Sequence, residues 1–557
     1  MNGRIVVEKG ILRLSNSNAL GDSPAEADGL LLSGGDTVLQ LTSGVTLNKH
    51  LTVGGGVATI QAYTGNSSLI GQFNSDSQTV FVLDSVNTLT LSGAAGLGRT
   101  GSTIMAVGTG TLVVDAPSAG SIPYGFLIRG SAIVKANPVT NPFGSANLFM
   151  GDDNFGYKTP TTPTTPTLLL NGVTVANNLF LSPVTDSRRV GNSATTGSSL
   201  SGQVFLESAA DVTLASLVEN AKLTVSGNIR DDANTAGVVI GTAGFANLGK
   251  VDFTRTSGNS YDGTTTVNSG TLLANNASGS ATGTGAVLVN RGAVLGGSGV
   301  ISGSTTISGS LRPGNSIGTI SIGSTVTWNS GDSWVFELGT AGASQSSPGM
   351  SDSLNITAGN FNKGTGSSWT FDFAGTGARG WYKLVDWSGT SNFSASDFVI
   401  TNLTYGLSGR IVLDTVNSVL SLEVTDGLSD YERWAIGYGL SSVQGLGSAD
   451  PDSDGLRNEV EFAFGGNPVL TDAGVIDVRK TVGGVTITFV SRDSGITYEV
   501  QSTTDLAIGS WVSAVGTLTN DADQSRLSGG HTRKSFSVSS ADMPTRIFYR
   551  VRATFAP

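Results

Sequence analysis

The sequence predicts an all-β protein, a parallel β-solenoid followed by a short helix–loop–helix segment and a small β-sandwich. Only 13% of its 557 residues are charged, about half of the ~25% that is usual in soluble domains. Short segments of alternating apolar residues, separated by Gly, Ser, Asn and Asp, fill most of the chain. This two-residue period is typical of strands and not of helices. One such segment also recurs along the chain, and a recurring unit indicates a repeat architecture.

The repeat is visible in the glycine spacing of residues 1–322. The interval from Gly3 to Gly10 equals the interval from Gly263 to Gly270, and a short apolar segment follows each copy. A strand–turn unit this short cannot bury its apolar face alone, so neighbouring units must stack into one continuous core. We therefore expect stacked β coils with almost no helix. The first copy starts in mid-unit, which indicates that the chain was cut from a longer parent.

The composition changes after the repeats, because the first of the seven Trp residues is Trp328. We expect residues 323–425 to form wider strands that close the solenoid, since an open strand edge invites aggregation. Residues 426–470 are expected to form a helix–loop–helix junction. Alternating segments return in residues 471–557, which predicts a C-terminal β-sandwich module. We expect Trp511 to pack in its core.

Two segments carry a family resemblance. Residues 261–272 read Tyr-Asp-Gly-Thr-Thr-Thr-Val-Asn-Ser-Gly-Thr-Leu, and residues 311–320 read Leu-Arg-Pro-Gly-Asn-Ser-Ile-Gly-Thr-Ile. With residues 352–356 they resemble the autotransporter-associated β-strand repeat over residues 1–425. The resemblance implies a right-handed β-solenoid on the bacterial exterior. The module after residue 425 departs from true autotransporters, and this combination is similar to large secreted surface proteins of verrucomicrobial bacteria.

Residues 450–461 match the template of a Ca²⁺-binding loop. They read Asp-Pro-Asp-Ser-Asp-Gly-Leu-Arg-Asn-Glu-Val-Glu, with oxygen donors at loop positions 1, 3, 5, 9 and 12 and Gly at position 6. Ca²⁺ takes about 6–8 oxygen ligands, and crowded carboxylates repel one another without a cation. The predicted ligands are Asp450, Asp452, Asp454, the carbonyl of Leu456, Asn458 and Glu461. The alternative is a solvated acidic turn before a helix.

The segments that flank this loop support a metal site. Short helices are expected at residues 431–438 and 458–464, and residues 465–468 form a plausible stop signal. Arg457 stands at loop position 8, where paired Ca²⁺ sensors carry an aliphatic residue. The loop therefore resembles a thrombospondin type 3 repeat, which implies a structural clip and not a switch.

Several function classes are disfavoured. The net charge of −11 argues against nucleic acid and anionic membranes as partners, and no apolar run approaches the ~18 residues of a membrane span. The GxSxG motif at residues 314–318 is not expected to carry a nucleophile, because no helix follows it. The GxGxxG motif at residues 96–101 lacks a βαβ unit and is predicted to be a turn. His50 and His531 are the only histidines, without the spacing of a zinc site or triad, and both are expected at the surface.

The sequence thus predicts an extracellular structural or adhesive protein with polysaccharide or cell-surface components as partners and no catalytic residues. The alternatives are a β-helix polysaccharide lyase or glycoside hydrolase, and a carbohydrate-binding protein that uses Trp511. An enzyme would need convergent groups about 5–10 Å apart in a groove. The candidate catalytic residues of such an enzyme lie near the Pro/Thr-rich stretch of residues 159–167, which is expected to loop out of the solenoid. Their pattern is more typical of solvated turn residues. They are Asp152, Asp153, Lys158, Arg188 and Arg189.

Overall fold

The computed structural model divides the chain into two compact units, Met1–Asp426 and Gly427–Pro557, which are described separately. It describes residues 3–21, 23–76, 79–83, 87–93, 97–100, 103–118, 125–151, 164–182, 187–207, 210–232, 235–375, 377–404, 407–471, 475–507, 509–527, 529–544 and 546–555. Within these ranges the only α-helices are α1 (Asp430–Gly437) and α2 (Asn458–Phe464). Short 3₁₀ turns occur at Glu26–Asp28, Ala395–Asp397 and Ser540–Asp542. None of the described helices is long and apolar enough to cross a membrane.

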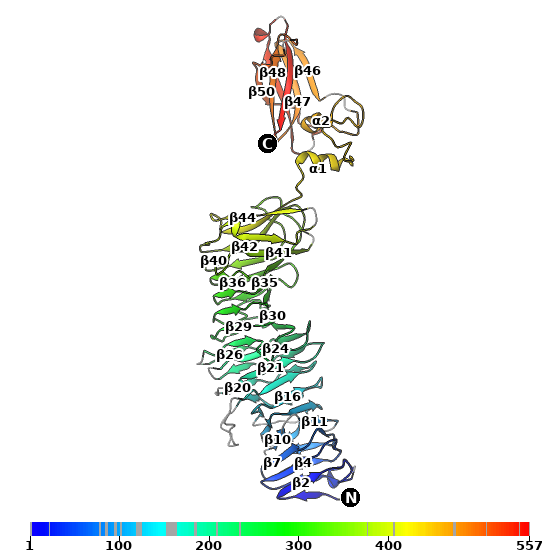
Figure 1. Cartoon of the computed structure of the whole chain (residues 1–557), viewed down its shortest axis with the longest axis vertical. Coiled ribbons are helices and arrows are strands. Elements are labelled where there is room, and N and C mark those ends of the chain that lie inside the picture. Colours follow the sequence, from blue (N-terminus) through cyan, green and yellow to red (C-terminus); the bar gives the residue numbers. More distant parts are fainter. Residues whose placement is uncertain are drawn as a thin grey trace. The chain divides into compact units, whose positions relative to one another are not determined.

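The first unit is a parallel β-solenoid whose strands stack as successive coils (Figure 1). One sheet has ten strands, namely β2 (Gly10–Leu14), β4 (Thr37–Leu41), β7 (Ala58–Ala62), β10 (Thr79–Leu83), β13 (Ile104–Gly108), β15 (Phe126–Ile128), β17 (Leu148–Met150), β20 (Leu179–Leu181), β23 (Val204–Leu206) and β26 (Ile229–Asp231). A second has fourteen, namely β5 (Thr46–Leu47), β8 (Ser67–Leu69), β11 (Thr88–Ser92), β14 (Thr111–Asp115), β16 (Ile133–Ala136), β18 (Thr167–Leu170), β21 (Arg188–Asn192), β24 (Val212–Ser216), β27 (Val238–Ile240), β29 (Thr265–Val267), β31 (Val287–Val289), β34 (Thr305–Ile307), β37 (Val326–Trp328) and β40 (Phe361–Lys363).

Four further sheets complete the coils. A five-stranded sheet contains β1 (Ile5–Val7), β3 (Leu30–Leu32), β6 (Leu51–Val53), β9 (Phe73–Ser75) and β12 (Leu97–Thr100). A seven-stranded sheet contains β19 (Thr174–Val175), β22 (Ser198–Leu200), β25 (Lys222–Val225), β28 (Lys250–Phe253), β30 (Gly270–Ala274), β32 (Ala293–Gly297) and β35 (Ser310–Pro313). A six-stranded sheet contains β33 (Val300–Ile301), β36 (Thr319–Ile322), β39 (Ser353–Ile356), β42 (Gly380–Trp387), β45 (Val419–Thr425) and β44 (Ser408–Asp414), and a three-stranded sheet contains β38 (Trp334–Leu338), β41 (Trp369–Gly375) and β43 (Phe398–Thr401).

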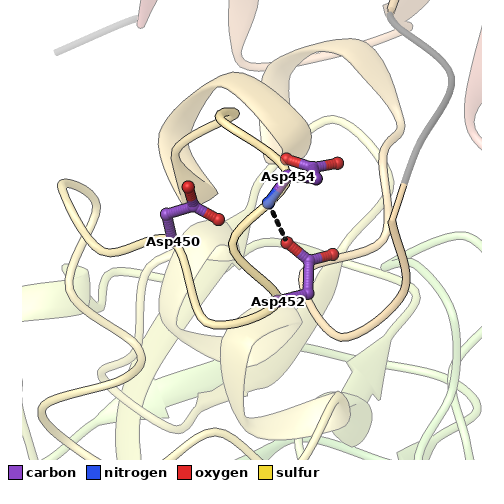
Figure 2. Close-up of side chains that lie close together, drawn as sticks. All are labelled: Asp450, Asp452 and Asp454. Atoms are coloured by element: carbon purple, nitrogen blue, oxygen red, sulfur yellow. Dashed lines mark hydrogen bonds between the residues drawn. The ribbon is translucent and has the colours of Figure 1, made fainter.

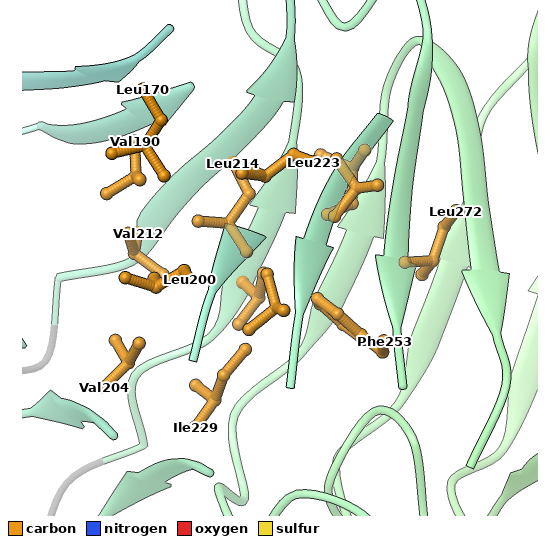
Figure 3. Close-up of a cluster of buried hydrophobic side chains, with 14 of the residues drawn as sticks. Leu170, Val190, Leu200, Val204, Val212, Leu214, Leu223, Ile229, Phe253 and Leu272 are labelled. Carbon is orange, nitrogen blue, oxygen red and sulfur yellow. The ribbon is translucent and has the colours of Figure 1, made fainter. Parts of the chain in front are cut away.

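The core of the solenoid consists of inward-facing side chains, which come from every second residue of each strand. In one coil Leu214, Leu223 and Ile229 come from three different sheets and converge with exposed fractions of 1% or less (Figure 3). Because the strands pair in parallel and in register, an inward residue stacks on the inward residue of the next coil, as Leu39 does on Ile60. Each fully buried aliphatic side chain contributes about 1.5–3 kcal/mol. The predicted all-β solenoid is therefore confirmed.

The recurring glycine marks the same local structure in both copies of the repeat. β1 and β2 are separated by the same two-residue turn as β29 and β30, and Gly10 and Gly270 begin the second strand with φ angles of +95° and +63°. A Cβ atom on Gly270 would lie 2.4 Å from the carbonyl oxygen of Asn247. Glycine is therefore favoured at both positions by the backbone angle, and at Gly270 also by the close approach of the neighbouring coil.

The Trp-containing end of the solenoid has a different core. The rings of Trp328 and Trp334 stack with centroids 3.8 Å apart, and the Nε1 atom of Trp369 donates to the carbonyl of Trp328 at 2.8 Å. Four strands here, β41, β42, β44 and β45, have seven or eight residues, and the last two, β44 and β45, pair in antiparallel fashion. This change from parallel to antiparallel pairing ends the coil pattern.

The second unit contains two small antiparallel sheets and the two helices. One sheet has the order β46 (Ile476–Thr481), β47 (Gly484–Arg492), β51 (His531–Ser539) and β50 (Thr517–Asn520), and the other has the order β49 (Val512–Ser513), β48 (Ile496–Thr503) and β52 (Phe548–Phe555). Ile487 and Phe536 from the first sheet share a core with Val500 from the second and Phe462 from α2. Gly465 ends α2 in the left-handed conformation with φ +74°, as its stop signal predicted.

Candidate functional site

The acidic loop lies between α1 and α2 and brings three of the predicted ligands together. One carboxylate oxygen from each of Asp450, Asp452 and Asp454 lies within 4.8 Å of the other two. Figure 2 shows the three side chains around one turn of the loop. Oxygen donors at this spacing suit a hard cation such as Ca²⁺.

Backbone geometry holds the three carboxylates in place. The N–H of Gly455 donates to Asp450 Oδ2 at 3.0 Å, and the N–H of Asp454 donates to Asp452 Oδ1 at 3.2 Å. The N–H of Leu456 donates to Asp454 Oδ1 at 2.7 Å. The sharp turn needs a positive φ angle at Gly455, which adopts +94°. Gly at loop position 6 serves this purpose in Ca²⁺-binding loops.

The carboxylates are electrostatically strained. Partial burial, followed by the charges of Asp454 and Asp450, raises the pKa of Asp452. Asp450 Oδ1 and Asp452 Oδ2 are buried and accept no hydrogen bond from the described part of the chain. A buried acceptor without a partner costs about 1–3 kcal/mol. A bound cation would satisfy these oxygens and remove the repulsion.

The other predicted ligands lie at the start of α2 or just before it. Asn458 is fully buried, and its Nδ2 atom donates to the carbonyls of Gln444 at 2.6 Å and Leu446 at 3.0 Å. Its Oδ1 atom is buried without a hydrogen-bond partner among the described residues. Glu461 is also fully buried but does not belong to the group of carboxylates within 4.8 Å. Leu456, half-buried, precedes them in the loop.

Only two of the five enzymatic candidates lie in the described part of the chain. Asp152, Asp153 and Lys158 lie outside the described residues, as does most of the Pro/Thr-rich stretch. Arg188 and Arg189 are not solvated turn residues as expected, because both lie in β21. Arg188 is fully buried and donates to the carbonyls of Ser182 and Ala210, while the guanidinium of Arg189 lies 5.5 Å from the ring centre of Phe245.

Of three smaller expectations, the structure contradicts two. His50 is not a surface residue, because only 3% of it is exposed and its Nε2 atom lies 3.1 Å from Nδ2 of Asn74. The turn expected within the GxGxxG motif is wrong for its central residues, which form β12. The GxSxG motif is followed by β36 and not by a helix, so the context of a nucleophile elbow is missing there.

Two arrangements escaped sequence reasoning. Trp511 does not pack in the core of the terminal module but is half-buried, with the guanidinium of Arg550 4.4 Å from its ring centre. Asp352 is 2% exposed and accepts two backbone N–H groups, from Gly318 and Glu337. Its place in the repeat-like segment of residues 352–356 was the only signal in the sequence.

Comparison with known proteins found no family model that matches this chain and no match among curated proteins.

Proposed function

We propose that this chain is a structural or adhesive part of an extracellular protein. In this proposal the solenoid is a stiff spacer, and a Ca²⁺ ion in the loop of residues 450–461 stabilises the terminal module. The observation that carries the proposal is the unbroken core of the solenoid. One hydrophobic cluster extends from Leu14 to Val424.

Stiffness follows from this construction. Each interior strand is bonded to a strand on either side, and the inward side chains interlock along the stack. Bending the stack would break backbone bonds and open gaps in a close-packed core. Repeat proteins of this kind present long regular surfaces, which suits a spacer or an adhesin.

The buried charged groups of the described solenoid also favour a structural role. Asp252 is 2% exposed and pairs with Lys222 at 2.8 Å. Arg188 and Asp352 bind backbone groups. These charges connect neighbouring coils and are not directed into a shared groove, as catalytic groups would be.

The enzymatic alternative can be tested at one carboxylate pair, Asp231 and Asp262. The backbone N–H of Asp262 donates to Asp231 Oδ2 at 3.1 Å. Burial raises the pKa of Asp231, and the charge of Asp262 raises it further. In glycoside hydrolysis one of two carboxyl groups has a raised pKa and acts as the general acid. If the alternative were correct, polysaccharide cleavage would be detectable and would be lost in Asp231→Asn.

The Ca²⁺ part of the proposal is supported by the three converging carboxylates and by the buried Oδ1 atom of Asn458, which has no hydrogen-bond partner among the described residues. Titration calorimetry of the full chain tests it. We expect one Ca²⁺ per chain, and we expect Asp452→Asn to weaken binding while Asp477→Asn, on the exposed strand β46, leaves it unchanged. Heat equal to buffer dilution would contradict the metal site.

The extracellular part needs a separate experiment. An antibody against the terminal module should label intact cells of the source organism, and protease added outside the cells should remove the label. Labelling only after the cells are made permeable would contradict the proposal.

A further inference from the structure

One face of the terminal module carries an ordered network of aromatic and charged side chains. In β48 the side chains of Tyr498 and Val500 pack on the core, so Glu499 and Gln501 lie on the opposite face, because side chains alternate along a strand. In β52 Val551 packs on the same core, which places its two neighbours on that opposite face. Both neighbours, Arg550 and Arg552, are exposed.

The network fixes the orientation of one guanidinium. Arg550 Nε donates to Gln501 Oε1 at 2.8 Å, and Gln501 Nε2 donates to Glu499 Oε2 at 2.7 Å. The hydroxyl of Ser513 donates to the other oxygen of Glu499. The guanidinium of Arg550 lies 4.4 Å from the ring centre of Trp511. Gln501 is only 6% exposed, so packing as well as hydrogen bonds holds this network in place.

The network leaves hydrogen-bond donors of Arg550 free to bind a ligand. The Nη1 and Nη2 atoms of Arg550 make no hydrogen bond within the described structure, and the side chain is exposed. A planar pair of N–H groups matches the two oxygens of a carboxylate. The hydrogen bonds from Ser513 and Gln501 lower the pKa of Glu499, which therefore stays an ionised acceptor. A carboxylate beside a guanidinium can accept hydroxyl groups of the same ligand.

Positive charge is concentrated on this face although the chain has a net charge of −11. Arg546 lies 5.0 Å from the ring centre of Phe548, in a second arginine–aromatic pair. Arg552 is exposed and lowers the pKa of Glu499 through its charge. Two arginines, Arg550 and Arg552, therefore stand beside one glutamate, Glu499. This excess favours an anionic ligand.

We propose that this face binds an acidic polysaccharide that carries uronate carboxylates. Arg550 binds a carboxylate through its two Nη groups, Trp511 contacts the apolar side of a sugar ring, and Glu499 accepts a sugar hydroxyl. This inference gives the adhesive role a ligand class, and to that extent it rests on the proposed function. It does not depend on the Ca²⁺ site.

Two other classes of anionic ligand fit the network less well. Extended peptides bind by adding a strand to a sheet edge, whereas these side chains stand on the broad face of the sheet. Single-stranded nucleic acid stacks its bases on aromatic rings within a wholly cationic groove. Here Glu499 interrupts the positive charge, and single-stranded DNA offers this acceptor no sugar hydroxyl, whereas a uronate ring offers several.

Affinity electrophoresis of the full chain tests the proposal. The gels contain polygalacturonate, dextran sulfate, neutral dextran or poly-L-glutamate, and a separate binding assay uses a single-stranded oligothymidylate. We expect retardation by polygalacturonate and none by dextran. Trp511→Ala and Arg550→Ala should each weaken retardation about tenfold, and Arg550→Lys should do the same because lysine keeps the charge but lacks the planar pair of donors.

The control is Arg479→Ala, which removes an exposed arginine from the other sheet of the same module and should change nothing. Circular dichroism of each variant verifies its fold, and Arg552→Ala, which removes a charge outside the hydrogen-bond network, provides a second variant with an expected loss. Equal or stronger binding of poly-L-glutamate, dextran sulfate or the oligonucleotide would overturn the uronate assignment. Unchanged retardation of the Arg550 variants would overturn it as well. Neither result would bear on the proposed Ca²⁺ stabilisation or on the proposed surface location.

Discussion

Asp352 Oδ1 accepts the backbone N–H of Gly318 at 2.9 Å, a bond between residues 34 positions apart. Its Oδ2 atom accepts the N–H of Glu337 at 2.8 Å. The bonds connect the loop between β35 and β36 with the end of β38 and with the residue before β39. A single buried carboxylate therefore holds three segments of the solenoid end in one arrangement.

The pH dependence of stability should report this carboxylate. Burial raises the pKa of Asp352 from 3.8 to about 6, against the opposing effect of the two N–H donors. Between these values the folded protein binds more protons than the unfolded chain, so the free energy of unfolding should fall as pH rises from about 4 to 6 and then level off. The fall is at most about 3 kcal/mol, because one unit of pKa corresponds to 1.36 kcal/mol.

Asp352→Asn should remove this pH-dependent component of unfolding, measured by denaturant titration between pH 4 and 7. Asp36→Asn makes the same chemical change at an exposed turn and serves as the control. An Asp352→Asn protein with the pH profile of the wild type would show that Asp352 is not the titrating group.

The stacked rings of Trp328 and Trp334 predict a large loss of stability on truncation. Both side chains are fully buried. Trp334→Ala should lower the free energy of unfolding by about 3–5 kcal/mol, since it removes the buried ring and leaves a cavity. Val416→Ala, at a position 90% exposed, should change it by less than about 0.5 kcal/mol. Equal effects of the two substitutions would contradict the packed aromatic end.

Two glycine turns allow the cost of a strained backbone angle to be measured separately from the cost of a steric clash. Gly270 and Gly292 both adopt positive φ angles, +63° and +77°, but a Cβ atom on Gly292 would meet nothing within 4 Å. Gly292→Ala should therefore cost only the left-handed backbone, about 1–2 kcal/mol. Gly270→Ala should cost more, because its Cβ atom would also collide with the carbonyl of Asn247. Thermal unfolding of the two variants makes the comparison.

The sequence predicted those structural features that depend on residues close together in the chain. Alternation alone places Leu223 and Val225 inside the solenoid, because each strand faces the core with every second residue. The three aspartates converge because they share one tight turn. His50 contacts Asn74 in the next coil, and the half-buried Trp511 contacts Arg550 from a distant part of the sequence. Contacts of this kind are set by tertiary packing and leave no local pattern.

Removal of Ca²⁺ should destabilise the terminal module and leave the solenoid unchanged. A ligand that binds only the folded state stabilises it by about 2.7 kcal/mol at a hundredfold excess over Kd. In the full chain, a chelator should therefore speed amide hydrogen exchange in residues 444–466 and in β47, which contacts α2. Exchange in the strands of the first unit should stay the same, since each coil depends mainly on its neighbours.

Glu461→Gln tests the ligand set within this experiment. Glutamate at loop position 12 supplies two oxygens to Ca²⁺, and glutamine can supply one. Because the substitution changes a buried side chain, the informative quantity is the difference between exchange with Ca²⁺ and exchange with chelator. That difference should shrink in Glu461→Gln and in Asp452→Asn, and it should persist in Asp477→Asn. Identical exchange with and without Ca²⁺ in the unsubstituted protein would leave residues 450–461 as an acidic turn that binds no metal.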